Sequence, residues 1–210
     1  MDGAYSLRRG VRRHSSVLSA LLCACVLVPA QQPPHPLQLT ESGQVVVEGR
    51  PTPYLIRRLP VSSFPDLPSQ VQQALTQRGC MIPQTYQAHH PENVIHARLE
   101  RPGSLDWAVL CSVQGSVSLL VFFTSAPTQP FVLATAPETQ RLQQHGSSST
   151  LGFNWGIDPA SPNQIHEAQS GLEHRPPWVD HDAVADSVID HRTVYHFYAT
   201  NTWTKLEMPQ

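Results

Sequence analysis

Lysine, long apolar runs and clustered positive charge are scarce in this 210-residue chain. Lys205 is the only lysine, and no basic stripe runs along the sequence. Nucleic acid and anionic lipid bind surfaces with clustered cations, so neither is expected as a partner. The apolar run at 17–28 (VLSALLCACVLV) is too short to cross a bilayer comfortably, and we expect no transmembrane segment once it is removed.

The chain also lacks the short motifs of several common catalytic sites. It contains no G-x-S-x-G, no HExxH and no EF-hand loop, and neither GxGxxG nor GxxxxGK[ST] occurs. These motifs position a nucleophile, a metal ion or a phosphate group. A pair of carboxylates for glycoside hydrolysis leaves no such signature, because its spacing is set by the fold. The absence of these motifs favours a non-enzymatic protein, and an enzyme remains the alternative.

The first thirty residues have the layout of a secretory signal peptide. Four arginines at positions 8, 9, 12 and 13 precede the apolar run, and Val28-Pro29-Ala30 supplies a cleavage site. We therefore predict a signal peptide at 1–30 and an exported protein, periplasmic or extracellular. In an alternative interpretation, Leu22-Cys23-Ala24-Cys25 is a bacterial lipobox and the protein is lipid-anchored through Cys25.

Removal of the leader changes the charge and the cysteine count. The leader carries four of the 14 basic and one of the 16 acidic residues, so ten and fifteen remain, a net charge of −5. Only Cys80 and Cys111 remain of the four cysteines. A pair of cysteines in an oxidising compartment predicts a disulfide, although two buried thiols are the alternative. Such a disulfide would close the loop between Cys80 and Cys111 and stabilise the fold by about 3–4 kcal/mol.

Composition divides the remainder into an arm and a domain. Residues 31–63 are rich in proline, which fixes φ and removes a hydrogen-bond donor, so we predict an extended N-terminal arm there. Within it, Val45–Val47 and Tyr54–Ile56 could still pair at a sheet edge. Residues 64–210 are predicted to form a single α+β domain.

One helix and a meander of strands are predicted in this domain. Asp66 is a cap candidate for a helix that would end at Gly79, followed at once by Cys80. Alternating apolar residues predict antiparallel strands at 93–99, 106–112 and 116–123. A further strand is expected at 127–134, a loop at 137–152, irregular structure at 156–177 and a terminal hairpin at 193–206. The predicted fold is thus one helix, disulfide-tethered to a mostly antiparallel sheet, with a core of Leu67, Val71, Leu75, Trp107, Val109, Leu119 and Val121.

The Asp180–His191 segment concentrates possible metal ligands, namely His181, Asp182, Asp186 and His191. Imidazole and carboxylate groups together can hold zinc or another divalent ion. If 182–191 were helical, Asp182, Asp186 and Asp190 would share one face. A solvated acidic surface is the alternative, and the pattern favours it.

Three aromatic residues lie in regions without clear periodicity: Phe153, Trp155 and Trp178. If exposed, they could anchor a binding partner. If buried, they would fill the open end of a sheet, which is the commoner outcome.

Parts of the chain resemble a group of exported bacterial proteins without an assigned activity. The resemblance is strongest over 64–123, at Gly79-Cys80-Met81-Ile82-Pro83-Gln84 and at Asp106-Trp107-Ala108-Val109-Leu110-Cys111-Ser112. A weaker similarity surrounds His181-Asp182, where the group has glycine and this chain has Ala183. The resemblance implies a single disulfide-bonded domain and does not indicate a substrate.

Three functional hypotheses follow. The leading one is an exported, non-enzymatic binding or inhibitor-like module of the bacterial envelope, with an unknown protein or small ligand and no cofactor. The second is a metal-binding protein or metal-dependent hydrolase that uses the Asp180–His191 segment and a divalent metal. The third is a lipid-anchored structural protein of the envelope.

Overall fold

The computed structural model describes residues 39–207. The predicted signal peptide, Cys25 and the start of the predicted arm lie outside the described residues. Within them, no helix is both long enough and apolar enough to cross a membrane.

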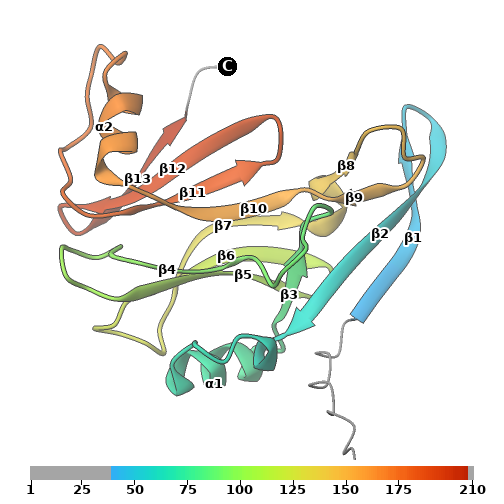
Figure 1. The fold of residues 1–210 in the computed structure, drawn as a ribbon, viewed down its shortest axis with the longest axis horizontal. Coiled ribbons are helices and arrows are strands. Elements are labelled where there is room, and N and C mark those ends of the chain that lie inside the picture. The colour runs from blue at the N-terminus through green and yellow to red at the C-terminus, as the bar shows by residue number, and fades with distance from the viewer. Residues whose placement is uncertain (1–38, 208–210) are drawn as a thin grey trace, which may run out of the picture. The chain divides into compact units, whose positions relative to one another are not determined.

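Two β-sheets and two α-helices make up the described chain (Figure 1). The first sheet has nine strands, in the order β7-β6-β5-β3-β2-β9-β8, with β1 beside β2 and β4 beside β5. These strands are β1 (Leu39–Val47), β2 (Arg50–Pro60), β3 (Met81–Gln84), β4 (Val94–Ala97), β5 (Asp106–Val113), β6 (Ser116–Phe122), β7 (Phe131–Pro137), β8 (Leu142–Gln144) and β9 (Leu151–Phe153). All of their pairings are antiparallel except that of β2 with β9.

The second sheet is a four-stranded antiparallel meander that occupies the C-terminal part of the chain. Its strands are β10 (Trp155–Ala160), β11 (Ala183–Val188), β12 (Arg192–Ala199) and β13 (Thr202–Glu207). The helices are α1 (Ser69–Gln77) and α2 (Pro162–Gln169), with short 3₁₀ helices η1 (Val61–Ser63) and η2 (Glu138–Arg141). The fold is therefore mostly β, with two helices where the sequence predicted one.

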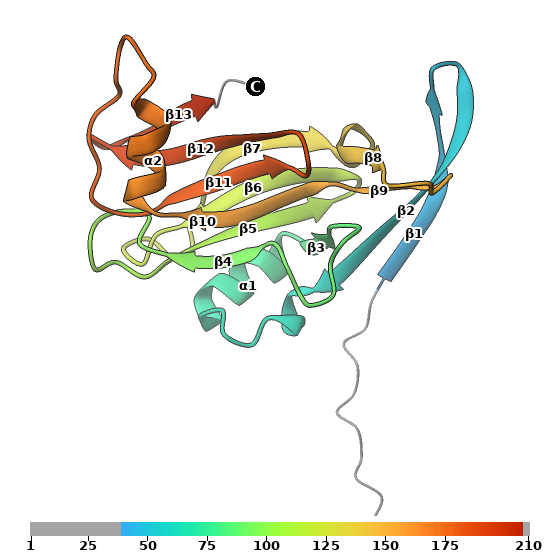
Figure 2. The same ribbon diagram turned by 45° about the horizontal axis from the view of Figure 1, so that its top comes forward.

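Alternation along β5 shows how the layers stack. Ala108 and Leu110 pack into a core shared with the second sheet, whereas Val109 and Cys111 pack into a core shared with α1. Both faces of β5 are buried, which explains why it is apolar at nearly every position. Figures 1 and 2 show α1 on one side of β5 and β6 and the second sheet on the other. A third cluster packs α2 against the outer face of the second sheet.

Helix α1 forms where its apolar stripe predicted it. Leu67, Val71 and Leu75 are buried against the first sheet. Gly79 ends this region in the left-handed conformation (φ +72°), which glycine adopts without strain. The predicted cap is wrong, because Pro68 is the N-cap residue and no side chain bonds the first turn.

Residues 39–60, which we placed in an extended arm, form a β-hairpin within the first sheet. All nine residues of β1 pair with β2, and Glu48 and Gly49 make the turn with positive φ values of 49° and 78°. On its other edge, β2 pairs with β3 and β9. The sheet therefore begins before Phe64, and the suggested edge pairing of Val45–Val47 is present.

The region between 137 and 191 differs most from its prediction. The expected loop contains η2, β8 and β9, and the expected irregular segment contains β10 and α2. A capping box at Ser161 and Gln164, with Pro162 in the first turn, starts α2 and was a signal that the sequence carried. Residues 183–188 form the inner strand β11, so the helix considered at 182–191 is wrong.

The predicted core is largely correct. Six of the seven predicted residues are buried, namely Leu67, Val71, Leu75, Val109, Leu119 and Val121. Trp107 is only half-buried, because it borders a surface cleft. The terminal hairpin predicted at 193–206 is present as β12 and β13.

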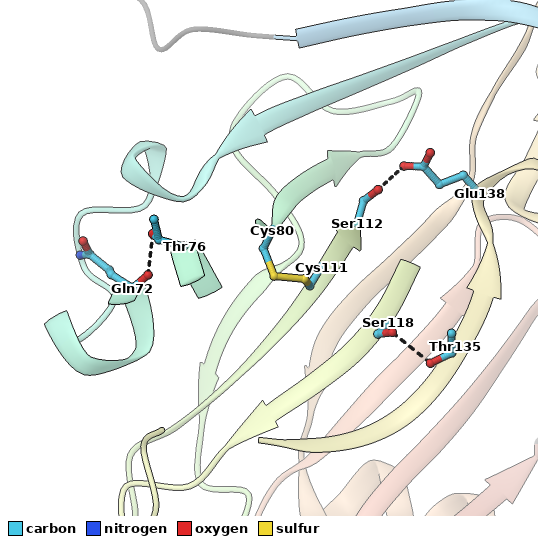
Figure 3. Close-up of a disulfide and its surroundings, with 8 residues drawn as sticks. All are labelled: Gln72, Thr76, Cys80, Cys111, Ser112, Ser118, Thr135 and Glu138. Carbon is cyan, nitrogen blue, oxygen red and sulfur yellow. Dashed lines mark hydrogen bonds between the residues drawn. A yellow bond between two sulfur atoms is a disulfide. The ribbon is translucent and has the colours of Figure 1, made fainter. Parts of the chain in front are cut away.

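Cys80 and Cys111 form the predicted disulfide, with their Cα atoms 5.1 Å apart (Figure 3). Cys80 lies between α1 and β3, and Cys111 lies in β5. The bridge is adjacent to the Met81–Ser112 register that joins β3 to β5. It thus links the junction between α1 and β3 to the centre of the first sheet.

Candidate functional site

The structure places the four predicted metal ligands in different surroundings. Asp182 accepts hydrogen bonds from the Arg98 backbone (3.1 Å) and from its guanidinium group (2.9 and 3.1 Å). Burial opposes ionisation of Asp182, but the hydrogen bonds from Arg98 outweigh it and lower the pKa of this carboxyl. His181 is buried and His191 is exposed.

Asp186 is buried, as His181 is. Its carboxylate accepts a 2.6 Å hydrogen bond from Trp155 Nε1 and lies 3.0 Å from His196 Nε2. Because β11 is a strand, Asp182 and Asp186 do not form the helical stripe that a cation would need. Over residues 39–207, no three His, Cys, Asp or Glu side chains are placed to hold a metal ion.

Of the three candidate aromatic anchors, the structure exposes one. Phe153 and Trp155 are almost completely buried between the sheets and cannot contact a partner. Trp178 is 72% exposed, and its ring stacks on His166 of α2. A single exposed ring that packs on α2 of the same chain offers only a small contact surface.

An apolar surface cleft lies beside α1. This α1 cleft, of about 370 Å³, is lined by residues that include Pro68, Val71, His96, Leu105, Trp107 and Phe122. Helix α1 and the residue before it supply one wall, and the rest comes from β4, the start of β5 with Leu105 before it, and the end of β6 with the segment after it. No Asp, Glu, Lys or Arg side chain lines it, so the site is apolar.

Strand pairing positions the aromatic part of the α1 cleft. His96 in β4 lies directly opposite Trp107 in β5, and their rings stack with centroids 4.5 Å apart. Leu105, just before β5, is 58% exposed at the edge of the cleft. Such an exposed apolar side chain beside a half-buried tryptophan is costly in water and favourable in contact with an apolar ligand.

The sequence reasoning missed this site. It assigned Trp107 to the core because Trp107 shares a strand face with Val109 and Cys111, and the structure confirms that shared face. Trp107 is nevertheless half-exposed, because it lines the α1 cleft together with Pro68 and Val71. An isolated Leu105 in a turn was the available signal, and by itself it is weak.

A second cleft, of about 410 Å³, lies between the loop after β3 and the start of β10. It is more polar and includes Glu92, Asp158 and Ser187. Glu92 is held by a 2.7 Å hydrogen bond from Thr85 Oγ1, so part of its polar lining is already satisfied within the protein.

Comparisons of the chain with protein-family models, curated proteins and solved structures found no match.

Proposed function

We propose that this protein is an exported, non-enzymatic binding module that takes a small apolar ligand into the α1 cleft. The observation that carries the proposal is the cleft itself, with apolar walls and a stacked His96–Trp107 pair. Small-molecule sites are typically concave and apolar with a few polar groups for orientation. Here Gln70, His96 and Thr124 are the polar side chains in reach of a ligand.

The aromatic pair favours a ligand with a flat, uncharged apolar group. A ring packed on the exposed part of Trp107 would gain about 0.5–1.5 kcal/mol beyond its buried area. Each Å² of apolar surface removed from water adds about 25 cal/mol. A charged ligand would lose its hydration without finding an ionic partner among the lining side chains.

Part of this proposal concerns the disulfide. Val71 and Cys80 pack in the same apolar cluster, and Val71 also lines the α1 cleft. We propose that the Cys80–Cys111 bridge tethers α1 to the first sheet and so keeps the wall of the cleft in place. A bridge of this kind is expected in an oxidising compartment, which agrees with export.

N-phenylnaphthylamine, an uncharged fluorophore that brightens in apolar sites, tests the proposed binding. The wild-type protein should bind it saturably at one site. Leu105→Glu should weaken binding about tenfold, or 1.4 kcal/mol, because it places a charge at the edge of the cleft. Leu55→Glu is the matched control, since Leu55 is 43% exposed on β2 and outside the cleft.

No saturable binding, or equal binding by both glutamate variants, would contradict the proposed site. His96→Ala provides a second variant, because His96 is exposed and its loss should not unfold the protein. It should also weaken binding by removing the stacked partner of Trp107.

The proposed export is tested by the mass of the mature N-terminus. We expect cleavage after Ala30, which leaves Gln31 as the first residue. A diacylglycerol-modified Cys25 would instead establish the lipid-anchored alternative, and an intact Met1 would contradict export.

A further inference from the structure

Arg141 differs from the other partly buried arginines of the structure. It is the last residue of η2, and its guanidinium carbon lies 4.0 Å from the centre of the Trp155 ring. Trp155 is completely buried, so Arg141 covers the ring at one end of the space between the two sheets. Its side chain is half-buried as a result.

Within residues 39–207, the Arg141 guanidinium has neither a hydrogen-bond acceptor nor a carboxylate at ion-pair distance. The contrast with Arg58 is direct, because Arg58 bonds both Glu138 and Glu41. Arg57 donates instead to the carbonyls of Thr85 and Ala88. A partly desolvated cation without such a partner is energetically unfavourable.

Asp186 is the carboxylate whose charge acts on the Arg141 guanidinium, but both of its oxygens already make hydrogen bonds to other side chains. Its Oδ1 accepts from Trp155 Nε1, and its Oδ2 is bonded to His196 Nε2. It therefore compensates the charge of Arg141 only from a distance.

The backbone of a second arginine, Arg192, lies at the same end of the second sheet as Trp155. Trp155 pairs with Val188, and Val188 pairs with Arg192. Directly paired residues place their side chains on the same face of a sheet, so Arg192 shares the face of Trp155 at a separation of about 10 Å. Burial lowers the pKa of Arg141; the charge of Asp186 opposes this, and the charge of Arg192 lowers the pKa further.

We propose that Arg141 and Arg192 form a binding site for an oxyanion, such as the phosphate or sulfate group of a small ligand. Two guanidinium groups and one committed carboxylate leave an excess of positive charge, which an anion would neutralise. The contact with Trp155 is made through the guanidinium carbon of Arg141, 4.0 Å from the ring centre. The N–H groups of a guanidinium surround that carbon and can donate two parallel hydrogen bonds to an oxyanion.

The double charge of phosphate and sulfate matches a site with two cations better than a single carboxylate does. The site shares no residue with the α1 cleft, so its existence does not depend on the proposed function. Its ligand is also of the opposite chemical kind, charged instead of apolar.

Titration calorimetry with inorganic phosphate, sulfate and acetate tests the proposal, with chloride used to keep the ionic strength constant. Wild-type protein should bind phosphate or sulfate saturably and more tightly than acetate. Arg141→Gln and Arg192→Gln should each weaken binding about tenfold or more, because each removes a charge-assisted hydrogen-bond donor. Arg50→Gln, at the exposed tip of the β1–β2 hairpin, is the control and should bind as the wild type does.

Arg192→Gln keeps the test valid if the loss of Arg141 perturbs folding, because Arg192 is exposed. The proposal would be overturned by an absence of saturable anion binding, or by binding that neither Arg141→Gln nor Arg192→Gln weakens. Equal weakening by Arg50→Gln would also overturn it, because it would indicate a nonspecific charge effect.

Discussion

Single carboxylates connect segments that are far apart in the sequence. Asp182, just before β11, binds Arg98 through three hydrogen bonds and so joins the second sheet to the end of β4. Asp106 accepts from the backbones of Leu99, Glu100 and Thr124 at 2.8–2.9 Å. Acceptors of this kind satisfy backbone donors that leave the strand ladder, which is why these loops can be ordered.

Asp182→Asn should reduce the acid sensitivity of the protein. The pKa of Asp182 is lowered in the folded state, so its ionised form contributes stability above the ordinary pKa of about 3.9, and this contribution is lost as the pH falls through the folded-state value. The variant should lose about 1 kcal/mol at pH 7 and show a shallower decline in acid. Thermal melts from pH 7 to pH 2 measure this, with Asp158→Asn as an exposed control.

Asp186→Ala should lower the free energy of unfolding more than Asp182→Asn does, because the Asp186 side chain is buried. It would leave Trp155 Nε1 and His196 Nε2 without their acceptor, at about 1–3 kcal/mol for each unsatisfied group. Asp186→Asn, which retains one acceptor oxygen, should lose less. Urea unfolding followed by circular dichroism compares the two variants, and equal losses would show that hydrogen bonding is not the cause.

At the scale of elements, short segments depend on the sheets for their stability. Helix α1 has nine residues and no side-chain cap, and helices of this length are marginal in isolation. Its stability comes from the burial of Val71, Ala74 and Leu75 in the apolar cluster shared with the first sheet. Helix α2 is one residue shorter, with eight residues, although its capping box specifies where it starts.

Replacing both bridge cysteines, as Cys80→Ser with Cys111→Ser, should destabilise the protein by about 2–5 kcal/mol. If the bridge tethers α1, the double variant should also bind N-phenylnaphthylamine more weakly under conditions where it remains folded. Urea unfolding and fluorophore titration supply the two readouts. An unchanged unfolding midpoint would show that the bridge is dispensable, and unchanged fluorophore affinity in the folded variant would contradict the tether alone.

At the scale of the molecule, one apolar cluster joins the two sheets. It draws residues from the first sheet, including Leu110 and Leu119, and from the second, including Trp155 and Val184. Because each sheet buries the inner face of the other, neither has a complete core alone. The described chain is therefore expected to unfold as a unit.

Leu110→Ala tests this coupling. Leu110 is completely buried in the shared cluster, so the substitution should cost about 2–5 kcal/mol. Tryptophan fluorescence and far-ultraviolet circular dichroism should still report one transition with the same midpoint. Two separated transitions would show that the sheets unfold independently.

The sequence predicted the elements that carry strong local signals. The apolar stripe of α1, the alternation in β5 and β6, and the terminal hairpin were all identified, as was the Cys80–Cys111 bridge. The β1–β2 hairpin was obscured by prolines at 51 and 53, which suggested an extended arm. Strand β11 was ambiguous, because its short apolar pattern fits helix and strand alike.

By itself, the sequence determined the local elements and the Cys80–Cys111 bridge. Periodicity and turn residues act within short stretches, and the bridge is a single bond between the two cysteines. Only the tertiary structure decided that the second sheet covers the first, that Trp155 is core and that Trp107 borders a cleft. It likewise separated the Asp180–His191 residues and brought Arg141 to Trp155. Those outcomes depend on which faces meet, and that is a property of packing between distant segments.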